Sequence, residues 1–127
     1  MHKSRLAGFI IDCQTPDLTA AAQFWSAALG LALKTASSKS QDAAYRSFDT
    51  GPNGLDIEVQ SVEHASRVHL DIETYDVEAE VARLVNLGAK RVQAVHTWWV
   101  MEAPTGQRFC VVRPQRSYFA AGAKTWD

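Results

Sequence analysis

The sequence has few of the features that mark specialised protein classes. Its 127 residues include only two cysteines, Cys13 and Cys110, which make no disulfide framework and favour a reducing, cytoplasmic compartment. No apolar run approaches the roughly 20 residues needed to span a bilayer, and the opening segment MHKSRLAGFIIDC turns acidic too early for a signal peptide. A formal net charge of −1 draws the protein neither to nucleic acid nor to anionic lipid.

Short catalytic motifs are absent as well. The sequence has no glycine-rich phosphate loop, CxxC pair, GxSxG turn or HExxH helix, so none of the enzyme classes that these motifs mark is supported. What remains is ordinary for a globular domain, with 46% hydrophobic and 21% charged residues.

An internal repeat is the most informative feature that is present. The run AGFIIDCQTPDLTAAAQFWSAALGL at 7–31 matches SRVHLDIETYDVEAEVARLVNLGA at 66–89, and GPNGLDIEV at 51–59 matches APTGQRFCV at 103–111. We therefore expect one domain, 1–127, built from a first module at about 7–60 and a second at about 66–114. The aromatic tail 115–127 matches neither module and is expected to pack on another surface.

Each module reads as a strand, a helix and three further strands, the order βαβββ, which predicts the α+β class. The polar residues 37–42 are expected to be a loop. The predicted strands are 8–14, 31–36, 43–49 and 55–60 in the first module, and 67–73, 90–95, 97–102 and 107–113 in the second.

The two predicted helices have recognisable ends. Thr15 can cap the first, which ends at Gly30, and Thr74 or Asp76 starts the second, which ends at Gly88. In the first helix we expect an inward stripe and an aromatic pair in the core. Those residues are Leu18, Ala22, Phe24, Trp25 and Leu29.

These runs resemble the vicinal oxygen chelate superfamily, which groups glyoxalases, bleomycin-resistance proteins and dioxygenases, and within it the glyoxalase-like domain family. The similarity rests on IDCQTPD…FW…LGL, on VHLDIETYDVEAEVARLVNLGAKRV and on the closing APTGQRFCVVRP, and it covers about residues 7–114. It implies an incomplete barrel of two βαβββ modules with a central cleft. Because the superfamily hosts lyases, dioxygenases, epimerases and metal-free binding proteins, the fold alone does not define the function.

Metal-dependent members of the superfamily place ligands on the first and last strands of each module. In this sequence those positions hold Ile10, Glu58, His69 and Cys110. Isoleucine has no lone pair, and a thiolate suits zinc but not the magnesium, manganese or ferrous iron of oxygen-rich sites. We therefore expect no metal and no cofactor. The alternative is a divalent site, such as zinc, made by Glu58, His69 and Cys110, and Cys110 can equally be a small buried hydrophobic residue.

His69 and Asp71 are the predicted catalytic pair. In the strand RVHLDIE, Arg67, His69, Asp71 and Glu73 share one face, which should line the cleft, while Val68, Leu70 and Ile72 should meet the helices. An Asp two residues from a His can hydrogen-bond it, which suits general acid–base chemistry. Alternatively, the Asp side chains only tie strands together as hydrogen-bond acceptors.

The predicted ligand-binding residues complete the cleft. They are Asp12, which corresponds to Asp71 in the repeat, together with Glu58, Trp98 and Cys110. Only one of the adjacent Trp98 and Trp99 can face the cleft and stack on a planar ligand, and strand packing accounts equally for either indole.

The sequence thus predicts a glyoxalase-like protein that binds a small organic ligand, either without catalysis or as a metal-independent acid–base enzyme. The alternatives are a metal-dependent lyase or isomerase of the glyoxalase type and a drug-sequestering protein like those of bleomycin resistance. We also predict a homodimer, because strand edges must be covered and the tail is free to cover one.

Overall fold

The computed structural model describes residues 1–35 and 44–127, so the predicted loop 37–42 lies outside the described residues. Hydrogen-bonded strands follow the order β2-β3-β1-β4-β7-β6-β5, and β8 pairs with β1. The chain forms two compact units, Phe9–Val68 and a second unit of Met1–Gly8 with His69–Asp127. The α+β class is confirmed, and the central cleft between the modules stays a prediction. Among the described residues, no helix is long and apolar enough to span a membrane.

The unit Phe9–Val68 contains most of the first module. Strand β1 (His2–Gln14) starts six residues earlier than predicted and runs through both units. Helix α1 (Leu18–Leu29) follows, then β2 (Tyr45–Ser47) and β3 (Asp56–Val62), which pair antiparallel. The strand predicted at 31–36 is reduced in the described residues to a single bridge between Leu33 and Phe48.

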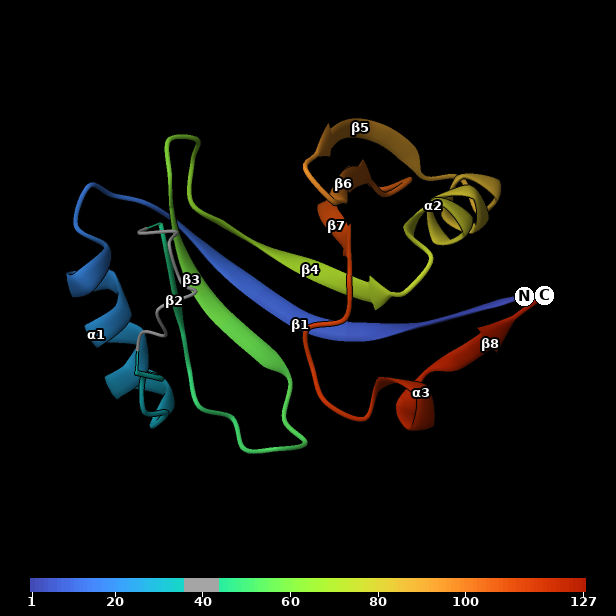
Figure 1. The fold of residues 1–127 in the computed structure, drawn as a ribbon. Helices are drawn as coiled ribbons and strands as arrows, with labels where there is room; N and C mark the ends of the chain where they lie inside the picture. The colour runs from blue at the N-terminus through green and yellow to red at the C-terminus, as the bar shows by residue number, and fades with distance from the viewer. Residues whose placement is uncertain (36–43) are drawn as a thin grey trace. The chain divides into compact units, whose positions relative to one another are not determined.

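The other unit contains the second module, with strand ends close to those predicted (Figure 1). Its elements are β4 (Arg67–Thr74), α2 (Val77–Asn86), β5 (Lys90–Val95), β6 (Trp98–Glu102) and β7 (Arg108–Val112). Strand β4 pairs parallel with β7, and β6 pairs antiparallel with both β5 and β7. The predicted βαβββ order is therefore complete in this half.

Both helices begin with the same short capping motif. Thr15 Oγ1 accepts a hydrogen bond from the Asp17 amide, and Asp17 Oδ1 accepts one from the Ala20 amide. Thr74 and Asp76 repeat this geometry toward Ala79. The cap of α1 is thus Asp17 rather than the predicted Thr15, which instead orients the capping residue. Gly30 ends α1 with a left-handed φ of 69°, as its glycine predicts.

Each unit has its own apolar cluster. In the first, Leu18 and Ala22 of α1 are buried on Ile11, Phe48 and Val59, and Trp25 packs against them only partly buried. The prediction that Phe24 and Leu29 belong to the core is wrong, because these residues are 62% and 44% exposed. The reason is geometric, since Phe24 lies to the side of the stripe that α1 turns to the sheet, and Leu29 is the last residue of the helix.

In the second cluster, Val81, Leu84, Met101 and Val111 are buried, and Ile72 packs against them. The prediction that the whole apolar face of β4 meets helices is wrong for Val68 and Leu70, which are 59% and 51% exposed.

The tail folds back onto its own chain. Helix α3 (Phe119–Gly122) buries Phe119, and β8 (Lys124–Trp126) pairs antiparallel with the start of β1 through His2–Trp126. Figure 1 shows the two termini side by side. The tail therefore covers an edge of β1 in the same chain, and it is not reserved for a partner.

Candidate functional site

The polar face of β4 brings three chemically active side chains together. His69 and Asp71 alternate with apolar residues on this strand, and the parallel register places Cys110 of β7 directly beside Asp71. His69 Nε2 lies 3.5 Å from Asp71 Oδ1. The ligand atoms of His69, Asp71 and Cys110 all lie within 4.8 Å of one another.

Asp71 is the unusual member of this cluster. Its residue exposure is 8%, and Oδ1 is buried without a hydrogen-bond partner in the described part of the chain. A buried acceptor without a donor costs about 1–3 kcal/mol. The atom closest to satisfying it is His69 Nε2, which makes an ion pair there when the imidazole is protonated. The site is therefore prepared to receive a proton or a donor group.

The same donor set can be tested against the metal that the superfamily implies. Imidazole nitrogen, carboxylate oxygen and thiolate sulfur are all zinc ligands, and three of them leave one coordination position open. His69, Asp71 and Cys110 therefore fit a zinc-type ion. The four-ligand arrangement does not fit, because Ile10 offers no donor atom and is 2% exposed.

The predicted site residues of the first module lie in the other unit. Asp12 is 2% exposed, and its Oδ2 is 3.7 Å from Arg67 Nε. Glu58 Oε1 accepts a hydrogen bond of 2.9 Å from Ser47 Oγ. Their grouping with His69 and Cys110 stays a prediction.

The two cysteines have different surroundings. Cys13 packs against the apolar cluster under α1, as its strand parity predicts, whereas Cys110 stands beside Asp71. Burial, with a contribution from the Asp12 carboxylate, raises the pKa of the Cys13 thiol. Because the thiolate is the reactive form of cysteine, the raised pKa makes Cys13 less reactive at neutral pH.

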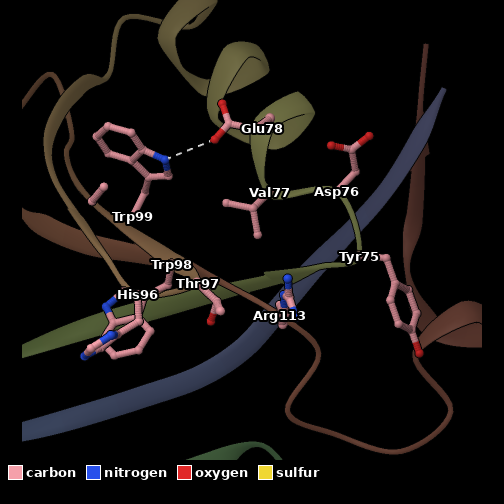
Figure 2. A pocket seen from close by; sticks show the side chains of 10 residues that line it. Tyr75, Asp76, Val77, Glu78, His96, Thr97, Trp98, Trp99 and Arg113 are labelled. Atoms are coloured by element: carbon pink, nitrogen blue, oxygen red, sulfur yellow. Dashed lines mark hydrogen bonds between the residues drawn. The ribbon is translucent and has the colours of Figure 1, made fainter.

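Trp98 lines a different place, an open pocket of about 400 Å³ between the first turn of α2 and the β5–β6 hairpin (Figure 2). Trp99 also borders this pocket. Which of the two indoles faces the predicted central cleft stays a prediction. The pocket includes His96 and Arg113, which the sequence analysis did not single out. No motif marks them, because a hairpin tip and a strand end bring them together.

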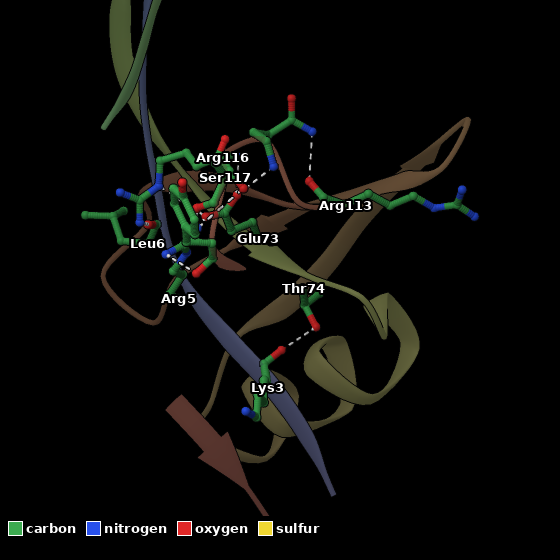
Figure 3. A network of polar contacts seen from close by, with 10 residues as sticks. Lys3, Arg5, Leu6, Glu73, Thr74, Arg113, Arg116 and Ser117 are labelled. Carbon is green, nitrogen blue, oxygen red and sulfur yellow. Dashed lines mark hydrogen bonds and ion pairs between the residues drawn. The ribbon is translucent and has the colours of Figure 1, made fainter. Parts of the chain in front are cut away.

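Glu73, the last polar residue on this face of β4, is fully buried and has a structural role (Figure 3). Arg5 Nε donates to it at 2.6 Å and Arg116 Nε at 3.2 Å, and the amides of Gln115 and Arg116 also donate. All four bonds are used to hold the start of the tail against β1 and β4. Glu73 is therefore not available to a ligand.

Comparisons with known proteins agree with this fold. The model of a family described as glyoxalase-like domain matches residues 8–112. The solved structure of hypothetical protein BH1468 from Bacillus halodurans C-125 has a TM-score of 0.61 at 12% identity, over 90% of this chain and 97% of that chain. This likeness shows a shared fold alone.

A second solved structure is described as a glyoxalase/bleomycin resistance protein/dioxygenase family enzyme from Burkholderia phytofirmans PsJN. It is 18% identical, covers 80% of this chain and 94% of that chain, and has a TM-score of 0.31. None of the curated proteins compared with this chain matches it. The family match spans nearly the whole repeat, from β1 to the end of β7. The chain therefore belongs to the glyoxalase-like domain family.

Proposed function

We propose that this protein binds a small organic ligand at the polar face of β4 and uses His69 and Asp71 for metal-independent acid–base chemistry. The observation that carries the proposal is the buried Asp71 Oδ1, which has no hydrogen-bond partner among the described residues and lies 3.5 Å from His69 Nε2. A carboxylate in this position stabilises the imidazolium that forms when His69 takes a proton from a bound ligand.

Each member of the cluster then has a defined role. His69 accepts the ligand proton and returns it, Asp71 orients the ring and balances its charge, and Cys110 borders the ligand. Asp12 and Glu58 remain ligand contacts predicted from the sequence. An isomerisation by proton transfer needs only such a returned proton, and in a lyase reaction the proton that His69 removed goes to the leaving group as its bond breaks. A protein without turnover uses the same groups as donors and acceptors for binding.

A metal-dependent reaction is the second candidate, because His69, Asp71 and Cys110 offer nitrogen, oxygen and sulfur within 4.8 Å of one another. When bound, a zinc-type ion would supply Lewis-acid polarisation of a ligand oxygen. Under this alternative Asp71 is a metal ligand and Glu58 is dispensable for holding the ion.

Elemental analysis of the dialysed protein separates the two candidates. The first proposal expects far less than one divalent ion per chain, and zinc addition should leave the melting temperature unchanged. Close to one zinc per chain that is lost in Asp71→Asn and Cys110→Ser, but kept in Glu58→Gln, would replace it with the metal-dependent candidate.

Ligand binding is tested by a small-molecule screen that follows the melting temperature. For any hit, affinity should fall about tenfold or more in His69→Gln and Asp71→Asn, the loss typical of one charge-assisted hydrogen bond. The exposed His64→Gln in the other unit is the matched control and should bind normally. The ligand should also slow labelling of Cys110 by a thiol reagent and leave Cys13 unaffected. A hit that binds His69→Gln equally well and leaves Cys110 labelling unchanged overturns the proposal.

A further inference from the structure

We propose that the pocket between α2 and the β5–β6 hairpin is a second binding site, which takes a small zwitterion of the free aromatic α-amino acid class. Its volume of about 400 Å³ is within the range of small-molecule sites. His69, Asp71 and Cys110 are not among its lining residues, so it is separate from the site proposed above.

One end of the pocket is aromatic and already ordered. The rings of His96 and Trp98 are 5.6 Å apart between centroids and tilted by 56°, and the Trp99 indole nitrogen donates to Glu78 Oε1 at 3.4 Å. In Figure 2, Trp98 lies beside His96 and Trp99 lies beside Glu78, with Val77 of α2 to their right. A flat apolar group can stack here while its polar end remains free to reach the charged residues.

The other walls carry charges of both signs. Asp76, the N-cap of α2, and Glu78, in its first turn, line the pocket, and Arg113 lies where β7 has just ended. In the same unit the guanidinium groups of four arginines are ion-paired to carboxylates, namely Arg5, Arg83, Arg108 and Arg116. No ion pair within 4.0 Å joins Arg113 to Asp76 or Glu78 in the described structure. Opposite charges thus line one pocket without neutralising each other.

This charge distribution selects the ligand class. A simple anion would meet Arg113 but would be repelled by two carboxylates, and a simple cation would meet the carboxylates but would be repelled by Arg113. A zwitterion places its carboxylate on the Arg113 guanidinium, which suits a bidentate contact, and its ammonium on Glu78 or Asp76. The aromatic wall formed by Trp98 and His96 then favours a ring as the third group.

Backbone conformation at the hairpin tip agrees with a shaped site. Val95 pairs with Trp98, so His96 and Thr97 form a two-residue turn, and His96 has a left-handed φ of 49°. Turns of this length usually place glycine, asparagine or aspartate where φ is positive. A histidine held there costs stability and presents its ring to Trp98, which is what the aromatic wall requires.

Three related probes test the assignment by isothermal titration calorimetry and tryptophan fluorescence on the full chain. L-phenylalanine carries both charges, 3-phenylpropanoate lacks the ammonium and 2-phenylethylamine lacks the carboxylate. We expect L-phenylalanine to bind about tenfold more tightly than either single-charge probe, which is the effect of one charged hydrogen-bonding group. Equal affinity for all three, or no binding of L-phenylalanine at about 10 mM, overturns the proposal.

Two variants assign the charges within the pocket. Arg113→Gln should weaken L-phenylalanine and 3-phenylpropanoate but not 2-phenylethylamine, and Glu78→Gln should show the reverse pattern. Arg91→Gln removes an exposed arginine of β5 outside the pocket and should change nothing. His69→Gln should also bind L-phenylalanine normally, so the proposals for the two sites can be refuted independently of each other. Binding that persists in Arg113→Gln and is lost in His69→Gln would place the amino acid in the other site and refute this one.

Discussion

Three buried acids in one unit differ in how fully their carboxylates are satisfied. Glu73 and Glu80 are fully buried. Arginine side chains and backbone amides donate to Glu73, and Arg83 and His2 contact Glu80. Asp71 is nearly as buried but leaves Oδ1 without a hydrogen-bond partner in the described residues. Since buried charges are normally compensated, the contrast separates residues that hold the fold from a residue available to a ligand.

Glu80 illustrates the structural kind and gives a pH-dependent prediction. Burial alone would raise its pKa, but hydrogen bonds from Arg83, His2 and Ser4, with the Arg83 charge, outweigh burial and lower the pKa. Because the folded pKa lies below that of the unfolded carboxyl, about 4.3, ionised Glu80 stabilises the fold fully above about pH 5. This stability is lost as pH falls through the folded pKa.

We therefore expect Glu80→Gln to cost about 3 kcal/mol at pH 7, as removal of one partner of a buried ion pair does. Urea unfolding at several pH values measures the cost, and the gap to the wild type should narrow below about pH 4. Glu78→Gln, on the exposed side of the same turn, should cost less than about 0.5 kcal/mol. If the difference in unfolding free energy between the wild type and Glu80→Gln did not change with pH, stabilisation by ionised Glu80 would be contradicted.

At the scale of elements, α1 contacts its sheet through one stripe. Trp25 packs on the cluster of Ile11, Phe48 and Val59. Its neighbour Phe24 contacts it edge-on, with 5.1 Å between the ring centroids, and remains 62% exposed. Trp25→Ala should cost about 3 kcal/mol by removing a large, partly buried aromatic. Phe24→Ala is the matched control and should cost below about 1 kcal/mol. Equal losses in urea unfolding would mean that the helix is rotated.

The tail is a second element with a defined anchor. Glu73 joins Arg5 of β1 to Arg116 and to two tail amides, so Glu73→Gln should cost about 3–5 kcal/mol and free the tail. Limited trypsin digestion should then cut after Arg116 and Lys124 faster than in the wild type. Glu102→Gln breaks the exposed pair with Arg108 and should cost at most about 1 kcal/mol without faster cleavage. Unchanged tail proteolysis in Glu73→Gln would refute the anchor.

The sequence predicted best what depends on local pattern. The strands of the second module and both helix ends at Gly30 and Gly88 follow from periodicity and turn residues, and the structure agrees. The contact between Asp71 and Cys110 needs the parallel register of β4 on β7, which no local pattern specifies. The exposure of Leu70 likewise depends on which elements cover that face of β4, which alternation along the strand does not specify.

At the scale of the whole molecule, the tail is used inside its own chain, because β8 pairs with the start of β1. Capping this edge removes one argument for a homodimer, while two leucines of the same unit remain exposed. Leu6 of β1 and Leu70 of the neighbouring β4 are 41% and 51% exposed. Neighbouring exposed apolar side chains of this kind often mark a protein contact.

We therefore retain the prediction of a homodimer and assign its contact to Leu6 and Leu70. Light scattering at micromolar concentration should give about twice the chain mass of 14.0 kDa. Leu70→Glu should shift the mass to that of one chain, because a carboxylate cannot be buried against a second apolar surface without a large cost. Leu29, the last residue of α1, is 44% exposed. Leu29→Glu is therefore the matched control and should remain dimeric. A monomeric wild type would refute the homodimer itself, whereas a dimer unaffected by Leu70→Glu would move its interface away from β1 and β4.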